Sequence, residues 1–551
     1  MTDLLPRWIK RVATEVGGRD PLGLSRVAMH LTDHLMPGII TMTDRARYYA
    51  IYCWILWHIE HEENPKSQTE FLSAFQRREA AIALATIIGD PNASPVGKRA
   101  VEKQLAKARD ENEVLLAFQV LPSNRLGGYG QYYAGCLYAL GLTHRPDGTF
   151  DRVTPGFAED LARSVHATLA TTPYVAKSLF TQPRLPLKSL EQSSERLGLD
   201  AIRKPYAATE RTLLINLLFG FNQKQPSFEA VRRCESLARM LEILDKYQEA
   251  GVAVVPDQLD LQLLYGPTYF NSLISADGNE EVESGVVTSF ASCDEQWQQF
   301  CLQQYLTQAI EILLASVLEV ISRNADGLTS EEILDVIVGG GEFSRHLAAI
   351  AGGRCRTPRQ LLERLDIRSV PNEGACLKAR KRYPFEHSLS EAALVSPEEG
   401  ESASHAAARA CVLLAVLYAK WRGVASDPAW RDVARISSSE LSGPTVLPRL
   451  DDWLDERRDW TAALRAVFEL IVSQHDRVMY GKGRLESRWL HMEDERYVKD
   501  QDHKPYFRSA RHLQATRIME DLGLVQRDAG GEFAITGRGR EILNRMGRSR
   551  Q

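Results

Sequence analysis

Paired cysteines are missing from this chain of 551 residues: its eight cysteines are scattered, and no two form a C-x-x-C. Scattered cysteines in a chain of this size indicate free thiols in a reducing compartment, and argue against a disulfide framework or a zinc site. The N-terminal stretch MTDLLPRWIKRVATEVGG has no apolar core of the signal-peptide type. We therefore expect a cytoplasmic protein.

Long hydrophobic runs are also missing. The most apolar long stretch is AAARACVLLAVLYAKW, residues 406–421, and Arg409 interrupts it. It is shorter than the roughly 20 residues that a membrane span needs. The stretch therefore predicts a buried helix, and we expect no association with a membrane.

An excess of positive charge is absent, since 67 Lys and Arg face 72 Asp and Glu, giving a net charge of −5. A protein coated in basic charge is thereby excluded. Any surface that contacts nucleic acid would have to be local.

Catalytic signatures are absent as well. The chain has no G-x-x-x-x-G-K-[ST], H-E-x-x-H or G-x-S-x-G, and YGKGR at 480–484 has the wrong spacing for a phosphate loop. His30 with His34, and His58 with His61, could each ligate a metal from one helical face, but spacing identifies no third ligand. We expect no metal, no cofactor and no enzymatic activity of the chain alone.

Helical periodicity dominates what is present, so the sequence predicts a mainly α, multi-domain protein. Apolar spacing predicts a helix at 24–35, with Thr43 as the cap of the next helix. Ser67 to Glu70 matches a capping box, and Ser227 and Thr329 each precede a further helix. The expected domains are an N-terminal helical domain at 1–110, a module at 111–175, a helical middle region at 176–400 with a basic segment at 354–387, a helical domain at 401–502, and a C-terminal module at 503–551.

One pattern occurs twice, nearly 400 residues apart. In the C-terminal copy, residues 508–524 form an amphipathic helix, VQRDAGGEFAIT (525–536) reads as strand, turn and strand, and Thr536 caps a last helix. The first copy has a helix at 127–142, a hairpin with Asp147-Gly148 at its turn, and a final helix capped at Thr154-Pro155-Gly156.

Helix, hairpin and helix in this order resemble the closing half of the winged helix-turn-helix domains of bacterial transcription regulators and DNA-processing complexes. The resemblance covers about 120–166 and 503–547, and it implies two winged-helix modules with small hairpin wings. In the first copy, tyrosines replace the basic residues that a DNA-reading helix exposes: Tyr129, Tyr132, Tyr133 and Tyr138. The two modules therefore need not share a role.

Local positive charge marks two candidate nucleic-acid contacts. Residues 503–551 hold ten Lys or Arg against five Asp or Glu. The candidates there are Arg508, Arg511, Arg517, Arg527, Arg538 and Arg540. The second candidate is the run KARKRYPF at 378–385, with Lys378, Arg380, Lys381 and Arg382 beside aromatic rings. Solvated charge is the alternative interpretation of both segments.

The N-terminal block LMPGIITMTDRARYYAIYCWILWHIE (35–60) combines arginines with aromatic rings. Arginines in a first helical turn are unusual, because the helix N-terminus prefers negative charge. They could pair with distant carboxylates, or bind a partner or a phosphate, while the rings on one face also fit a core. The partner-binding candidates are Arg45, Arg47, Tyr48, Tyr49, Tyr132 and Tyr133.

With the tyrosine-rich module that follows, residues 20–165 resemble bacterial proteins of anti-phage defence operons, which often accompany ATPases of the SMC or RecF type. The resemblance implies a non-enzymatic subunit whose partner supplies the ATPase or nuclease. We expect a DNA-associated scaffold or sensor subunit of a multi-protein assembly. Two alternatives stay open: a stand-alone transcription regulator, which needs a symmetric dimer, and a metal-dependent nuclease with carboxylates from distant segments.

Overall fold

The computed structural model describes residues 20–146, 150–224, 226–254, 272–274, 281–284, 293–365, 391–425, 440–482 and 488–548. The chain is mainly helical, as the sequence predicts, and its described strands form short two-stranded pairs.

The chain divides into two compact units, each of which combines stretches that lie far apart in the sequence. Unit 1 consists of Met1–Leu31, Tyr269–Ser272 and Gln296–Arg508. Unit 2 consists of Thr32–Thr268, Leu273–Glu295 and Ser509–Gln551. In chain order, most of unit 1 is therefore an insertion between two parts of unit 2.

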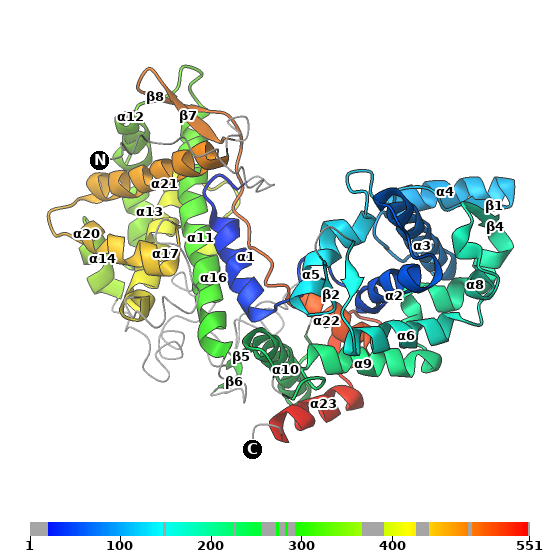
Figure 1. Cartoon of the computed structure of the whole chain (residues 1–551). Coiled ribbons are helices and arrows are strands. Elements are labelled where there is room, and N and C mark those ends of the chain that lie inside the picture. The colour runs from blue at the N-terminus through cyan, green and yellow to red at the C-terminus, as the bar shows by residue number, and fades with distance from the viewer. Residues whose placement is uncertain are drawn as a thin grey trace, which may run out of the picture. The chain divides into compact units, whose positions relative to one another are not determined.

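Unit 2 is built from helices around a shared core (Figure 1). Its described α-helices are α2 (Arg47–Glu62), α3 (Gln68–Gly89), α4 (Lys98–Glu111), α5 (Ala134–Ala139), α6 (Phe157–Leu169), α7 (Pro173–Ala176), α8 (Leu187–Leu197), α9 (Ala208–Leu218), α10 (Phe228–Glu249), α22 (His512–Asp521) and α23 (Gly537–Arg548). A π-helical turn is η1 (Tyr129–Tyr133), and 3-10 turns are η2 (Leu179–Thr181), η3 (Leu199–Arg203) and η4 (Pro205–Ala207). The strand pairs are β1 (Glu113–Leu115) with β4 (Arg184–Pro186), β2 (Thr143–His144) with β3 (Arg152–Val153), β5 (Ser272–Ile274) with β6 (Glu281–Ser284), and β9 (Val525–Arg527) with β10 (Phe533–Ile535).

The helix starts follow capping chemistry where the sequence supplies it. α1 spans Leu24–Leu35, as predicted. The Ser67 hydroxyl accepts from the amide of Glu70, and the Ser227 hydroxyl accepts from the amide of Ala230, both at 3.2 Å. Each bond satisfies an amide that the first helical turn leaves without a partner.

The predicted cap at Thr43 is wrong. Its hydroxyl accepts from the amide of Ile40 at 2.8 Å and donates to the carbonyl of the same residue at 3.1 Å. Because this turn occupies the hydroxyl, α2 begins later, at Arg47, without a side-chain cap.

Aromatic rings of the N-terminal block form part of the unit 2 core. The Tyr52 ring lies 5.2 Å from the Tyr133 ring and 5.4 Å from the Tyr129 ring, between ring centroids. Tyr49 and Trp54 are fully buried. Large rings dominate the energetics of such cores, so this block stabilises the unit.

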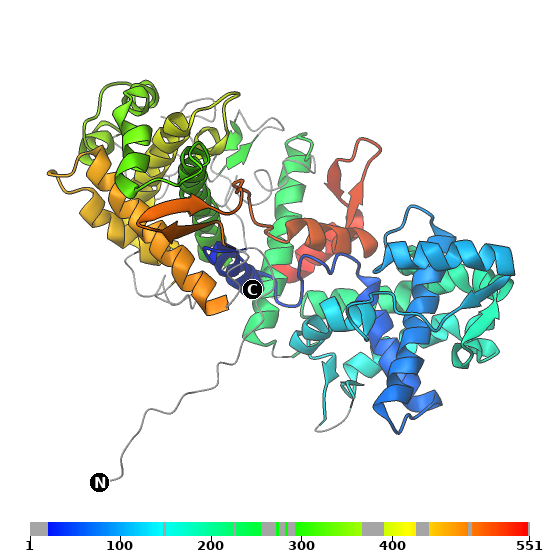
Figure 2. The same cartoon turned by 90° about the horizontal axis from the view of Figure 1, so that it is seen from above.

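The C-terminal stretch has the predicted order of helix, hairpin and helix. β9 and β10 pair antiparallel, with Val525 opposite Ile535. The Thr536 hydroxyl accepts from the amide of Gly539 at 3.1 Å and so caps α23, as expected. An isolated bridge joins Val254 to Phe533, and α23 packs against α10 in both views (Figure 1, Figure 2).

The first copy departs from its prediction in two places. Its leading helix is short, because the π-helical turn η1 precedes α5. Gly156 is the residue before α6, and no side chain caps that helix, so the predicted cap at Thr154 is wrong. The strands of its hairpin, β2 and β3, pair antiparallel, while Asp147 and Gly148 lie outside the described residues.

Unit 1 contains helices that pack around α11 and α17 (Figure 1). Its described α-helices are α11 (Asp294–Ile321), α12 (Ser330–Leu334), α13 (Glu342–Ile350), α14 (Pro358–Leu365), α16 (Glu391–Val395), α17 (Ala403–Ala425), α19 (Gly443–Val446), α20 (Leu450–Trp453) and α21 (Trp460–Lys482). Between them lie a π-helical turn, η8 (Asp335–Gly339), and a 3-10 turn, η9 (Leu447–Arg449), and the strands β7 (Leu490–Glu493) and β8 (Arg496–Lys499) pair antiparallel. Thr329 lies at the predicted start of α12 and forms a capping box with Glu332.

Two helices of unit 1 are strongly apolar. α17 confirms the buried helix predicted at 406–421, and Arg409 inside it is paired with Glu401 at 2.7 Å. In α11, Gln296–Ile321 is long and apolar enough to cross a membrane by length and composition, the one such helix among the described residues. Because 89% of its most apolar stretch is buried, α11 is a core helix.

Candidate nucleic-acid interface

Two of the C-terminal arginines are buried. Arg508 is 7% exposed, and its two terminal nitrogens donate to the carboxylate of Glu311 at 2.7 and 2.5 Å. Arg511 is 4% exposed and donates to Asp33 at 2.5 Å and to the Ile39 carbonyl at 2.8 Å. Neither guanidinium is placed to meet a phosphate, so both drop out of the candidate surface.

Three further arginines are half-buried or exposed but have acidic partners. Arg517 pairs with Asp44 at 2.7 Å, and Arg540 pairs with Asp245 at 2.7 Å. Arg527 lies 3.8 Å from Glu520 and covers the Phe533 ring. The pairs of Arg517 and Arg540 attach α22 and α23 to other parts of unit 2, and the Arg527 contact joins β9 to α22. Each of the three residues would have to exchange a carboxylate for a phosphate.

Arg538, at the start of α23, is different. It is exposed, and its closest acceptor is the Leu522 carbonyl at 3.5 Å. Within the described part of the chain, no carboxylate lies at ion-pair distance from it. Its neighbour is another cation, Arg211. Burial lowers the pKa of Arg211, and the positive charge of Arg538 lowers it further, against the smaller opposing effect of the Glu210 charge.

We call Lys204, Arg211 and Arg538 the basic patch. Arg211 donates to the carbonyls of Ile202 at 2.9 Å and Lys204 at 3.4 Å, which holds its guanidinium beside the turn that carries Lys204. As with Arg538, Lys204 and Arg211 have no ion-pair partner among the residues that the structure describes. Like charges held together in this way favour a bound anion.

Arg45 is part of an internal ion network. It donates to Asp521 at 2.9 Å and to Asp200 at 2.7 Å. Arg203 also donates to Asp521, at 2.8 Å. Burial alone would lower the pKa of Arg45, but the two carboxylates hold it above its ordinary value. Arg45 therefore pairs with distant carboxylates, one of the two roles that the sequence leaves open.

Arg47 is fully buried. Its Nε donates to Glu210 at 3.1 Å, and its Nη1 donates to the carbonyl of Gly198. Neither Arg47 nor Glu210 has an exposed side chain. This pair is not accessible to a protein partner.

The tyrosine candidates divide by burial. Tyr48, Tyr49 and Tyr133 lie in the core, and Tyr132 is half-buried at its edge. Tyr49 donates to the Gly38 carbonyl at 2.8 Å. Tyr48, Tyr49 and Tyr133 are therefore core residues, which is one of the interpretations that the sequence allows for these rings.

The second basic candidate cannot be placed. Lys378, Arg380, Lys381 and Arg382 lie outside the described residues.

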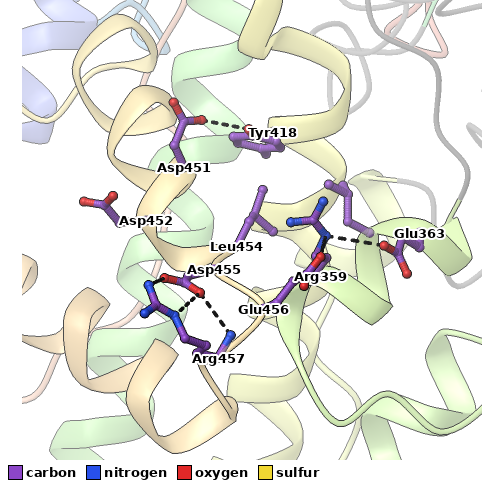
Figure 3. A pocket seen from close by; sticks show the side chains of 10 residues that line it. Arg359, Glu363, Tyr418, Asp451, Asp452, Leu454, Asp455, Glu456 and Arg457 are labelled. Carbon is purple, nitrogen blue, oxygen red and sulfur yellow. Dashed lines mark hydrogen bonds and ion pairs between the residues drawn. The ribbon is translucent and has the colours of Figure 1, made fainter.

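Unit 1 carries a depression of about 710 Å³ with an acidic lining (Figure 3). Most of its carboxylates have cationic partners: Arg359 lies 3.4 Å from Glu363 and 3.3 Å from Glu456, and Arg457 lies 2.8 Å from Asp455. The acidic charge is largely neutralised internally, so the depression carries no catalytic argument.

Catalytic and metal chemistry find little support in the described residues, where no three His, Cys, Asp or Glu side chains converge on a metal-sized site. His58 is buried and accepts from Arg78 at 3.1 Å, and burial and the Arg78 charge lower its pKa to about 2. His61 lies 2.8 Å from the Trp57 carbonyl. The His58–His61 pair is thus engaged within the helix and its surroundings.

No family model, curated protein or solved structure matches this chain. The basic patch is the feature that sequence reasoning missed, because Arg538 lies more than 300 residues from Lys204 and Arg211 in the sequence. Only Arg538 stood out as part of a basic run.

Proposed function

We propose that this chain is a nucleic-acid-binding, non-enzymatic subunit of a larger assembly, and that it holds the phosphate backbone on the basic patch. The observation that carries the proposal is the grouping of Lys204, Arg211 and Arg538 without carboxylate partners. Unpaired cations release counterions when they bind phosphate, whereas an ion-paired arginine must first lose its partner.

The exposed face of α23 extends the patch. Arg545 and Arg548 are exposed on the same helix as Arg538, and Glu541 is the acidic residue of that helix. The Arg545 guanidinium lies 3.7 Å from the centre of the Phe221 ring. Arg538, Glu541, Arg545 and Arg548 follow one another at spacings of three or four residues, so three cations and one carboxylate share this face of α23.

The C-terminal module takes the nucleic-acid role in this proposal, and we interpret both repeated modules as winged helices. Its element order and the antiparallel pairing of β9 with β10 support the interpretation. The first module contributes rings to the core, which suits a structural role.

The remaining parts of the proposal rest on the sequence. A partner that supplies ATPase or nuclease activity is what the resemblance of residues 20–165 implies, and the chain itself has no phosphate-loop motif. The resemblance of residues 20–165 to proteins of anti-phage defence operons is the ground for placing the assembly in phage defence.

The test is charge reversal of the two exposed patch residues, Lys204→Glu with Arg538→Glu. Binding of labelled oligonucleotides, measured by fluorescence anisotropy at several salt concentrations, should weaken at least tenfold. For a single-stranded probe, the salt slope should fall by about 0.7 for each phosphate that no longer meets a cation. The new glutamate beside Arg211 should leave the thermal stability unchanged or higher.

The matched control is Lys103→Glu, an exposed lysine on α4 in the same unit. It should bind as the unaltered protein does. Equal affinity of the double variant and this control would overturn the proposal.

A further inference from the structure

Two phenylalanine rings of unit 2, Phe221 and Phe228, are each covered by an arginine guanidinium, and the first of these arginines belongs to α23. From these pairs we infer that the basic patch takes a single strand of nucleic acid, whose bases stack on the two pairs while its phosphates lie on the patch. The inference rests on the proposed function and names the form of the nucleic acid. In a duplex the bases are stacked on one another, so they reach a protein ring only by leaving the helix.

The first pair joins the region after α9 to α23. The Phe221 ring lies 6.3 Å from the buried Phe219 ring, between centroids, with 18° between the two planes. The Arg545 guanidinium lies 3.7 Å from the centre of the Phe221 ring, and Arg545 is exposed. Bases stack on guanidinium planes as well as on aromatic rings. This pair therefore offers a flat, positively charged group at the surface.

The same pair lies within reach of the basic patch. Arg545 and Arg538 share one face of α23 and are two turns apart, which is about 10 Å along the helix axis. Glu541 lies between them on that face. Its carboxylate repels a phosphate at this point but not an uncharged base. A strand with a phosphate at Arg538 can therefore place a base at Arg545.

The second pair lies at the start of α10. Phe228 is 60% exposed, and the Arg232 guanidinium lies 4.4 Å from the centre of its ring. The chain before α10 passes close to the first pair, since a Cβ added to Gly220 would lie 3.9 Å from the Cβ of Pro226. Because α10 also packs against α9 and α23, the two pairs belong to the same part of unit 2.

Cations beside stacking groups are the combination with which proteins bind single strands. Lys224, between the two rings in the sequence, is exposed and has no ion-pair partner in the part of the chain that the structure describes. Stacking of one base on an aromatic ring corresponds to about 5- to 150-fold in affinity, and it depends little on which base is present. Two pairs therefore suffice to favour a strand with accessible bases.

The experiment compares three labelled probes with the same number of phosphates: a thymidylate strand, an abasic strand and a hairpin duplex. With the full chain, fluorescence anisotropy should give about fivefold or more tighter binding of the thymidylate strand than of the other two. Equal binding of the thymidylate and abasic strands, or tighter binding of the duplex, would overturn the inference and leave the proposed function standing. Failure to bind any of the probes would remove both.

The variant Phe221→Leu with Phe228→Leu removes both rings while it keeps the charge and most of the apolar volume. The ratio of the thymidylate affinity to the abasic affinity should fall towards one, and the abasic strand should bind as tightly as before. Phe228→Leu alone changes an exposed position, so it leaves the core intact and should lower the ratio part of the way. An unchanged ratio in both variants contradicts the inference.

The matched control is Tyr138→Leu, which removes a ring that is 69% exposed elsewhere in unit 2. Its affinity ratio should equal that of the unaltered protein. A control that lowers the ratio as far as the double variant does would contradict the assignment of stacking to Phe221 and Phe228. Lys204→Glu with Arg538→Glu should instead weaken the thymidylate and abasic strands together, because it removes phosphate contacts and leaves the rings in place.

Discussion

Burial separates the arginines of this chain into two groups. Arg47, Arg508 and Arg511 are taken out of water and matched to carboxylates or carbonyls. Arg538 stays exposed beside a second cation. Composition counts these residues alike, so a basic run in the sequence overstates the positive charge available to a ligand.

A substitution of Glu311, on α11, tests whether the buried arginines stabilise the fold. The side chain of Glu311 is fully buried and accepts from Arg508, and Nε2 of His503 lies 3.4 Å from it. Burial alone would raise the pKa of Glu311, but Arg508 and His503 hold it below its ordinary value. Glu311→Gln leaves Arg508 uncompensated and should cost about 3–5 kcal/mol in the free energy of unfolding.

The same carboxylate gives a pH dependence with a defined sign. A depressed pKa contributes stability above the unfolded value, and that stability is lost as the pH falls through the folded value. Urea unfolding at pH 7 and at pH 4 should show a smaller loss on acidification in Glu311→Gln. Glu319→Gln, which disrupts an exposed pair with Arg323 on the same helix, should change stability by less than about 0.5 kcal/mol.

Glu79 should act in the opposite direction. Burial raises its pKa to about 7, although hydrogen bonds from Tyr52 and the Gly128 amide oppose the shift. A carboxyl with a raised pKa favours the folded state when protonated, so its contribution grows as the pH falls from about 7 towards 4.5.

Glu79→Gln should abolish this contribution. The difference in unfolding free energy between wild type and Glu79→Gln, followed from pH 8 to pH 5, isolates it from buried His58, whose low pKa acts the other way. Glu102→Gln on the exposed face of α4 provides the control. A difference that is flat with pH would contradict the assignment.

At the level of elements, several polar contacts join α22 to the first part of the chain. Gln514 donates to the Thr41 carbonyl at 3.1 Å, and Asp521 accepts from Arg45, Arg203 and the Ala46 amide. These two polar side chains of α22 are therefore already engaged by other residues of unit 2.

Asp521→Asn should loosen that attachment. The carboxylate is fully buried, and its removal should lower the free energy of unfolding by about 2–3 kcal/mol. The loss is smaller than for a fully buried pair, because water can solvate the half-exposed Arg203. Amide hydrogen exchange in α22 and β9 should accelerate about 10- to 100-fold. Arg517→Gln, which removes a half-exposed pair with Asp44, should leave exchange nearly unchanged. Equal protection in both variants would contradict a central role for Asp521.

Local rules predicted the elements well where the chemistry is local. The spacing of apolar residues predicted α1 to the residue, and the hydroxyls at 227 and 329 predicted two helix starts. Thr43 failed because its hydroxyl closes a turn with Ile40. The partners of Arg45 lie more than 150 residues away, and no pattern in the sequence points to them.

At the scale of the whole molecule, the two units have separate cores, and we expect them to respond separately to substitution. In calorimetry, Glu311→Gln should lower one transition and Asp521→Asn the other. A single transition lowered equally by both substitutions would show that the units unfold as one.

The insertion of unit 1 into unit 2 has a consequence for synthesis. Arg211 leaves the ribosome long before Arg538, and at about 5–20 residues per second the interval is about 16–65 s. During that time unit 2 lacks α22, β9, β10 and α23. Lys204 and Arg211 are then present without Arg538, the third cation of the basic patch. A nascent chain cannot assemble the basic patch, so the nucleic-acid binding that we propose there would require a chain translated past residue 538.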